Sequence, residues 1–289
     1  MKEINYNSAA ALRAFLEAEG LGMRKKFGQN FLINPAVRQS LAQALEVESG
    51  GEVWEIGPGL GAMTALLLEK GARVTAFEID SGFIGILKEV FTDEKNFNLV
   101  EGDVMKTWKA QRAVPRLLGN LPYNIAAAFL ADLIEKGRLF TRMVVTVQKE
   151  VALRMAASAG SPDYSSFSLL CSSVYKIKPL MTIHSSSFYP RPNVDSMGVL
   201  LENKNSAPYP ETYYPLVRAL FASRRKTVKN NLTGFLASSM GKFLPAEGGA
   251  QDLCGSLLRE NGLAGSERAE ALEPEVFLSL AKSIQNMRL

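Results

Sequence analysis

The chain has 289 residues, 47% of them hydrophobic and 21% charged, which is enough for one large globular domain and a smaller second one. The net charge of +4 is compatible with a polyanionic partner. A single histidine, His184, and two cysteines without a CxxC context argue against a metal centre and a His-dependent triad. No apolar stretch is long enough to span a bilayer. We therefore expect a cytoplasmic protein without a metal.

Residues 1–23 are predicted to form an N-terminal extension. This segment carries acidic residues and lacks an apolar core, so it does not have the pattern of a signal peptide. Ala11, Phe15 and Ala18 are spaced as one side of a short amphipathic helix. Nothing in the composition of the extension indicates a role.

Strand-like and helical segments alternate from residue 52 to about residue 149, which predicts a parallel sheet with helices on both faces. Two later β-rich runs, 171–183 and 194–201, predict an antiparallel hairpin at the sheet edge. The fold class is therefore α/β and Rossmann-like, with a mostly parallel sheet and an antiparallel edge strand. The expected parallel strands are 53–56, 73–79, 97–101, 116–118 and 143–148, with helices that include 63–69 and 83–91.

A run of loop-forming residues at 202–210 predicts a domain boundary. We place the catalytic domain at 24–203 and a small all-α domain at 204–289. The helices expected in the second domain are 213–223, 225–237, 252–260 and 274–284.

A glycine-rich turn, EIGPGLG at 55–61, follows the first parallel strand. Its glycines, Gly57 and Gly59 among them, permit positive φ and close approach of the backbone to a ligand. The GxGxG spacing differs from the GxGxxG of dinucleotide-binding proteins. Glu78 ends the second strand, where it can accept hydrogen bonds from ribose hydroxyls, and Asp103 follows the third, within reach of an adenine amino group. These placements favour adenosylmethionine over NAD and over a turn with no ligand.

The tetrapeptide NLPY at 120–123 follows the fourth strand, at the sheet edge where ligands of open α/β sheets bind. The side-chain oxygen of Asn120 and the backbone carbonyl of Pro122 can accept hydrogen bonds from the two N–H groups of an exocyclic amine. Holding both protons favours the tetrahedral nitrogen that forms as a methyl group arrives, so no general base is needed before attack. Tyr123 can stack on a flat base. A plain proline turn with an aromatic anchor is the alternative.

Phe188 lies in the connection of the expected edge hairpin and could supply the second face of a base sandwich with Tyr123. An apolar plug of the hairpin is the alternative. The 188–196 connection is stiffened by two prolines, Pro190 and Pro192.

Basic residues gather at two places, Lys25 and Lys26 near the N-terminus and Arg224, Arg225 and Lys226 in the second domain. The second cluster is expected to begin a helix. Together they predict a basic rim for a phosphate backbone, with a solvated surface as the alternative.

The chain resembles the bacterial small-subunit ribosomal RNA adenine dimethyltransferases, from about Arg24 to the C-terminus. Several ordered motifs carry the resemblance, and their number makes it specific for the superfamily. The motifs are FGQNFL (27–32), EIGPGLG (55–61), EID (78–80), GD (102–103), GNLPYNI (119–125), QKEV (148–151), 188–196 and RRKT (224–227).

The resemblance implies a class I adenosylmethionine-dependent methyltransferase that transfers two methyl groups to N6 of each of two adjacent adenosines in the 3′-terminal hairpin loop of small-subunit (16S) RNA. It implies that the substrate is a small-subunit assembly particle, and we expect the enzyme to be a monomer. By position, the cofactor contacts would be Asn30, Leu32, Gly57, Glu78, Asp103 and Asn120. The base site would be Asn120, Leu121, Pro122 and Tyr123, with Phe188 opposite.

Two other readings remain open. The macrolide-resistance methyltransferases share the same clamp and act on large-subunit RNA, although the helical second domain favours the small-subunit enzyme. A non-catalytic assembly factor on the same fold is the second alternative, and the intact motifs argue against it. One departure from the family pattern is Asn193, where a lysine is usual, which puts one RNA-facing charge in doubt.

Overall fold

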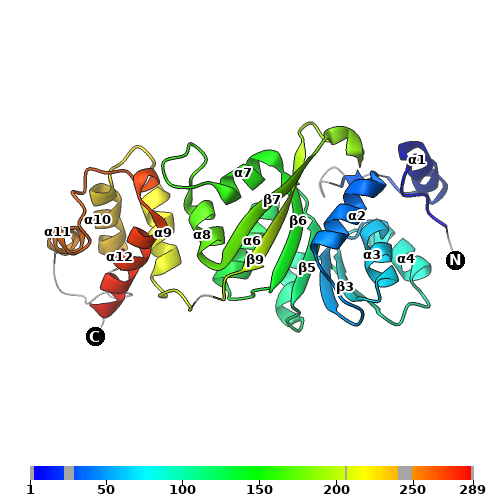
Figure 1. Ribbon diagram of the computed structural model, residues 1–289, viewed down its shortest axis with the longest axis horizontal. Coiled ribbons are helices and arrows are strands. Elements are labelled where there is room, and N and C mark those ends of the chain that lie inside the picture. Colours follow the sequence, from blue (N-terminus) through cyan, green and yellow to red (C-terminus); the bar gives the residue numbers. More distant parts are fainter. Residues whose placement is uncertain (1–2, 23–28, 206, 240–248, 288–289) are drawn as a thin grey trace. The chain divides into compact units, whose positions relative to one another are not determined.

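A computed structural model describes residues 3–22, 29–205, 207–239 and 249–287 (Figure 1). The chain forms two compact units. The first comprises Met1–Ala152 and Tyr175–Asn203, and the second comprises Leu153–Val174 and Lys204–Leu289. The change of unit after residue 203 coincides with the expected boundary. Residues 153–174, which we expected in the catalytic domain, belong to the second unit.

The first unit is built on a seven-stranded sheet in the order β4-β3-β2-β5-β6-β9-β7. Strands β2 to β6 run parallel, whereas β9 is antiparallel to both β6 and β7. The predicted α/β class and the antiparallel edge are thus confirmed. The strands are β2 (Glu52–Ile56), β3 (Arg73–Glu78), β4 (Phe97–Glu101), β5 (Arg116–Asn120), β6 (Arg142–Gln148), β7 (Tyr175–Ile183) and β9 (Ser196–Asn203).

The chain order along the sheet reverses between β2 and β5. From β2 the chain proceeds outward through β3 and β4, and it then returns to place β5 on the other side of β2. At such a switch point the loops after neighbouring strands diverge and leave a crevice at the carboxyl ends. The turn at 55–61 and the tetrapeptide at 120–123 both lie there.

Helices cover the sheet, with α2 and α3 in front of it and α6 behind it in Figure 1. Local sequence explains where several begin. Asn34 caps α2 and Pro35 occupies its first position, while Asp80 caps α4 by accepting from the Gly82 N–H. The helices are α2 (Pro35–Ala44), α3 (Ala62–Glu69), α4 (Ser81–Val90), α5 (Val104–Thr107) and α6 (Ala126–Glu135), while α7 (Lys149–Ala156) begins in this unit and continues into the second one from Leu153.

The edge hairpin differs in part from the prediction. Strand β7 starts at Tyr175, because residues 171–174 end helix α8 (Ser166–Val174). Leu170, Cys171 and Val174 are buried at helical spacing, which an apolar run does not distinguish from a strand. The connection after β7 contains the two-residue strand β8 (Phe188–Tyr189), which pairs antiparallel with β1 (Phe31–Leu32).

The N-terminal segment forms helix α1 (Ala9–Ala18), with Ser8 as its cap. The expected helix is present, and Phe15 of the expected side is partly buried against the cluster that contains Leu12 and Leu16, whereas Ala18 is exposed. Leu12 and Leu16 are the buried positions, because these two larger side chains, four residues apart, bury more apolar surface than Ala11 and Ala18 would.

The second unit is a helical cluster around one apolar core. Tyr164 and Leu169 belong to that core together with side chains of the C-terminal helices, which explains why residues 153–174 pack in this unit. Its helices are α8, α9 (Tyr213–Phe221), α10 (Val228–Ser239), α11 (Ala250–Glu260) and α12 (Pro274–Asn286).

The basic cluster at 224–226 does not begin a helix. It forms a turn ahead of α10, because the hydroxyl of Thr227 accepts a hydrogen bond from the Asn230 N–H at 3.4 Å and so marks the helix start. The prediction that the helix extends from residue 225 is therefore wrong by three residues.

Candidate active site

A cavity of about 320 Å³ opens at the carboxyl ends of β2, β3, β4 and β5. It collects predicted site residues that are far apart in the sequence. Those that line it are Asn30, Leu32, Gly57, Gly59, Glu78, Asp103, Asn120, Leu121, Pro122 and Tyr123.

The glycine-rich turn forms one wall of this cavity. Gly59 has a φ of +59°, and a Cβ there would lie 2.9 Å from the Phe31 ring. Any side chain at residue 59 would therefore be strained and would displace the Phe31 ring. The turn continues through Gly61, also at positive φ, into the first turn of α3.

Glu78, at the end of β3, is buried with only 6% of its surface exposed. Its carboxylate accepts from three backbone N–H groups: Gly59 at 3.2 Å, Ile79 at 2.9 Å and Asp80 at 2.9 Å. Burial nevertheless raises the pKa of Glu78 to about 7, because desolvation outweighs these hydrogen bonds. The side chain is thus held in one orientation at the cavity wall, as a carboxylate that titrates near neutrality.

Asp103 follows β4 and also lines the cavity. One carboxylate oxygen, Oδ1, accepts from the Met105 N–H at 2.9 Å and caps helix α5. This contact fixes the carboxylate beside the cavity and is the same type of capping that Asp80 provides for α4.

Asn120 ends β5 with its amide group in a defined orientation. Its Nδ2 donates to the backbone oxygen of Asn30 at 2.8 Å. Because a carbonyl can only accept, the end of the amide that faces Asn30 must be the NH₂ group. The acceptor oxygen of Asn120 is therefore the other end of the side chain, and no hydrogen bond to it is made by the residues that the structure describes.

The backbone carbonyls of Leu121 and Pro122 differ in whether they already accept hydrogen bonds. The Pro122 oxygen accepts from the N–H groups of Ile125 and Ala126, both at 3.0 Å, and so belongs to the start of α6. Within the described part of the chain, the Leu121 oxygen accepts no hydrogen bond. The expectation that Pro122 supplies the second acceptor is corrected here, since its carbonyl is already committed to the helix. Leu121 offers the available carbonyl.

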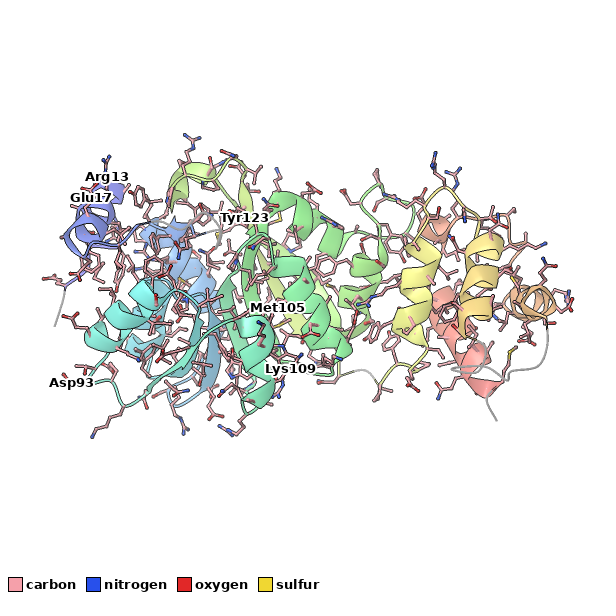
Figure 2. The ribbon with its side chains drawn as sticks, turned by 180° about the vertical axis from the view of Figure 1, so that it is seen from behind. Arg13, Glu17, Asp93, Met105, Lys109 and Tyr123 are labelled. Atoms are coloured by element: carbon pink, nitrogen blue, oxygen red, sulfur yellow. The ribbon has the colours of Figure 1, made fainter. Side chains whose placement is uncertain are left out.

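Tyr123 is half-buried, and its hydroxyl lies 2.6 Å from the hydroxyl of Ser196 (labelled Tyr123 in Figure 2). Ser196 is the first residue of β9, so the contact ties the loop after β5 to the antiparallel edge. Burial raises the pKa of Tyr123, which keeps the phenol protonated at neutral pH.

Phe188 is not brought to the cavity. It is 3% exposed, pairs across the ladder with Leu32, and packs in a core cluster that includes Leu32 and Leu41. The described residues that line the cavity do not include it. In this conformation Phe188 therefore stabilises strand β1 and does not face Tyr123, because the β1–β8 pairing turns its ring into the core.

Sequence reasoning missed part of the cavity wall, including the polar residues Tyr6, Arg38 and Glu55. Glu55 is 2% exposed and accepts from the Thr64 hydroxyl at 2.7 Å, and burial raises its pKa to about 7. Its position at the start of the glycine-rich motif was a usable signal. Tyr6 and Arg38 lie in no motif, and their positions depend on tertiary packing.

The predicted RNA-binding residues have different surroundings. Arg224 pairs with Glu270 at 2.8 Å and donates to the Pro162 carbonyl at 3.0 Å. Arg225 and Lys226 are exposed. Lys25 and Lys26 lie outside the described residues.

Neither a membrane-spanning helix nor a metal-binding cluster occurs in the ranges that the structure describes. The cavity suits adenosylmethionine, because Glu78 and Asp103 lie at the ends of successive strands and the glycine-rich turn reaches Glu78 through the Gly59 N–H. Together with the topology, this defines a class I adenosylmethionine-dependent methyltransferase.

Comparison with known proteins narrows this class. The family model for ribosomal RNA adenine dimethylase matches residues 20–243, and the chain belongs to that family. A ribosomal RNA small subunit methyltransferase A from Treponema denticola is 45% identical over 292 residues, covering 98% of this chain and 97% of that protein. One of the same name from Borreliella burgdorferi is 38% identical, covering 97% of this chain and 95% of that protein.

Solved structures agree on the fold. A dimethyladenosine transferase from Plasmodium falciparum superposes with a TM-score of 0.76 at 27% identity, covering 89% of this chain and 98% of that one. The 23S rRNA methyltransferase ErmE superposes with a TM-score of 0.62 at 20% identity, covering 88% of this chain and 98% of that one. The second likeness shows the shared fold alone.

Proposed function

We propose that this protein dimethylates N6 of two adjacent adenosines in the 3′-terminal hairpin loop of small-subunit ribosomal RNA. Membership of the ribosomal RNA adenine dimethylase family supports the chemistry. Relatives named ribosomal RNA small subunit methyltransferase A, matched over nearly the whole chain, support the choice of subunit. The observation that carries the mechanism is the orientation of the Asn120 amide, whose acceptor oxygen is left for a substrate.

Adenosylmethionine supplies an electrophilic methyl group to the reaction. On the protein side, Glu78 would accept hydrogen bonds from the ribose hydroxyls, and Asp103 would accept one from the adenine amino group. Both carboxylates are already oriented by backbone N–H groups before any ligand arrives. Such preorganisation lowers the entropic cost of binding.

The target amine would be held by two acceptors, Asn120 Oδ1 and the backbone oxygen of Leu121. Each accepts a hydrogen bond from one N–H of the adenine amino group, which turns the nitrogen lone pair away from conjugation with the ring. The nitrogen then attacks more readily, and its surplus proton can leave after transfer. Because Asn120 is fixed by Asn30, this geometry needs no rearrangement of the amide.

Tyr123 would stack on the target base, with its ring orientation held by Ser196. Exposed Arg225 and Lys226 of the second unit would contact phosphates. These contacts suit a structured RNA within a small-subunit particle, and we propose that the enzyme acts as a cytoplasmic monomer. Large-subunit RNA is the alternative substrate.

The test is to incubate the full chain with labelled adenosylmethionine and either small-subunit particles or large-subunit RNA, followed by mass spectrometry of the digested RNA. Dimethyladenosine at two adjacent positions of small-subunit RNA is the expected product. Label confined to large-subunit RNA would assign the alternative substrate, and no label in either RNA would favour the non-catalytic assembly factor.

A further inference from the structure

We infer that the N-terminal segment, residues 3–22, forms part of the cofactor site and supports cofactor binding. Tyr6 of this segment positions the glycine-rich turn and forms part of the cavity wall. This inference rests on the proposed assignment of the cavity to adenosylmethionine. The segment precedes every motif that identifies the family, and the sequence alone attaches no role to it.

Tyr6 connects the segment directly to the glycine-rich turn. Its hydroxyl donates to the backbone oxygen of Leu60 at 2.9 Å, and Leu60 lies between Gly59 and Gly61. Tyr6 and Leu12 of helix α1 both line the cavity. Burial raises the pKa of Tyr6 to about 12, so the phenol remains a hydrogen-bond donor across the physiological range.

A buried arginine fixes the backbone around Tyr6. Arg38 of α2 is 5% exposed, and its Nη1 donates to the Leu32 oxygen at 2.6 Å and to the Tyr6 oxygen at 3.2 Å. Its other terminal nitrogen, Nη2, donates to the Asn7 side chain. One guanidinium therefore joins the N-terminal segment to strand β1, whose Leu32 also lines the cavity.

Apolar packing also holds the segment against the glycine-rich turn and helix α4. Ile4, Leu12 and Leu16 form a cluster with Leu60 of the turn and with Phe83 and Ile86 of α4. Gly82, at the start of α4, leaves the space that Leu21 fills, since a Cβ there would lie 2.5 Å from Leu21 Cδ2. A side chain at this position would displace the end of the Leu21 side chain from the helix.

These contacts converge on the ribose-binding carboxylate. The three N–H groups that orient Glu78 belong to Gly59, Ile79 and Asp80. Tyr6 of the N-terminal segment donates a hydrogen bond to Leu60, the residue after Gly59. Leu21 of the same segment packs against Gly82, two residues beyond Asp80. The N-terminal segment thus contacts both loops whose N–H groups hold Glu78 in place. Loosening this segment should weaken cofactor binding more than it affects RNA binding.

The test is calorimetric titration of the full chain with S-adenosylhomocysteine, combined with steady-state kinetics. Tyr6→Phe keeps the ring and removes the hydrogen bond to Leu60, so we expect a Kd about threefold to tenfold higher. KM for adenosylmethionine should rise by a similar factor, while kcat and KM for the RNA substrate stay within twofold. The matched control is Arg13→Ala, which breaks the exposed Arg13–Glu17 pair on α1 (labelled in Figure 2) and should leave Kd unchanged.

Two further variants show whether a negative result concerns the N-terminal segment or the cofactor site itself. Gly82→Ala should raise Kd by displacing Leu21, and it tests the contact of the segment with α4 without touching Tyr6. An unchanged Kd for Tyr6→Phe, alongside a large loss for Glu78→Ala, would overturn this inference and leave the proposed cofactor site intact. An unchanged Kd for Glu78→Ala would overturn the site itself. A KM for RNA that rises in parallel with that for the cofactor would indicate general loosening and would also contradict the inference.

Discussion

The side-chain amide of Asn120 donates from Nδ2 to the backbone oxygen of Asn30, across 2.8 Å. Asn120 is the last residue of β5, and Asn30 comes directly before β1, 90 residues earlier in the chain. The contact determines which end of the amide is left to accept a hydrogen bond from the substrate. An amide that is fixed in this way can serve as half of a clamp for an amino group without reorganising.

Asn120→Ala should reduce methyl transfer by at least about a hundredfold to a thousandfold, the usual cost of losing one preorganised polar group that acts in the transition state. Binding to small-subunit particles should change by less than about threefold, because the RNA is held over a much wider surface. Single-turnover kinetics and a filter-binding assay measure the two quantities. Near-full activity of the variant would refute the clamp.

Asn120→Asp provides a sharper version of the same test. A carboxylate has no donor for the Asn30 oxygen, so the side chain would be repelled from its present orientation although its shape is conserved. We expect activity as low as that of Asn120→Ala. An aspartate variant with wild-type kcat would show that the contact with Asn30 does not set the geometry.

Cofactor affinity should depend on pH through Glu78. Its pKa is raised to about 7 by burial, so the acceptor carboxylate becomes protonated as the pH falls below that value. We expect the Kd for S-adenosylhomocysteine to rise as the pH falls from 8 to 6, by up to about tenfold per pH unit below the pKa. Glu78→Gln should bind more weakly at pH 8 and should lose most of this pH dependence.

Glu55 titrates in the same range and must be separated from Glu78. Burial raises its pKa to about 7 as well, and the charge of Glu78 contributes to the rise. Glu55→Gln should keep the pH dependence of cofactor binding if Glu78 is the ribose acceptor. Loss of that dependence in Glu55→Gln, with its retention in Glu78→Gln, would reverse the two assignments.

Glu55 should also limit the stability of the ligand-free protein at alkaline pH. A carboxyl group whose folded pKa exceeds its unfolded value of about 4.5 stabilises the fold below pH 4.5, and this contribution is lost as the pH rises to about 7. The Gln side chain in Glu55→Gln cannot ionise, so this variant should match the wild type near pH 4 and exceed its unfolding free energy by about 1–3 kcal/mol at pH 8. Urea unfolding at both pH values measures this, with the exposed Glu94→Gln as the control. Equal stability at pH 8 would contradict it.

The tie between Tyr123 and Ser196 should contribute to catalysis as a pair. Tyr123→Phe and Ser196→Ala each remove the same 2.6 Å hydrogen bond, so we expect similar losses of a few fold in kcat/KM for RNA. The double variant should lose little more than either single one, because coupled residues are not additive. Tyr123→Ala should lose about tenfold to a hundredfold through the missing stack. Full additivity of the two single variants would show that the contact does not orient the ring.

The three residues of the basic turn at 224–226 should have different roles, because their surroundings differ. Arg225→Ala and Lys226→Ala remove exposed charges and should each lower the slope of the logarithm of RNA affinity against the logarithm of salt concentration by about one. Arg224→Ala breaks the pair with Glu270 and should mainly lower the melting temperature. A salt slope unchanged by all three variants would remove this turn from the RNA interface.

The sequence predicts the sheet well because buried parallel strands are rich in apolar and β-branched residues, as at β6 (RMVVTVQ), whose five central residues are all buried. It also predicts Glu78, Asp103 and Asn120 at the cavity, since the ends of adjacent parallel strands meet at one edge. It fails where long-range packing decides the outcome. Phe188 is buried by pairing with β1, a contact that no local pattern specifies.

The assignment of the second clamp acceptor fails for a different reason. Leu121 and Pro122 each carry one backbone oxygen, and the motif does not show which of them is free. That choice depends on where α6 begins, because its first N–H groups take the Pro122 oxygen. The N-terminal segment is a further case, since Tyr6 reaches the cavity only through Arg38, Leu60 and the apolar cluster around them.

The most direct measurement is mass spectrometry of small-subunit RNA after reaction with isotopically labelled adenosylmethionine, comparing the wild type with Asn120→Ala under conditions where both bind the particle. We predict two adjacent dimethyladenosines for the wild type and only background label for the variant. Equal dimethylation by both proteins, or label at another position of the RNA, would contradict the assignment of Asn120 as the residue that holds the adenine amino group.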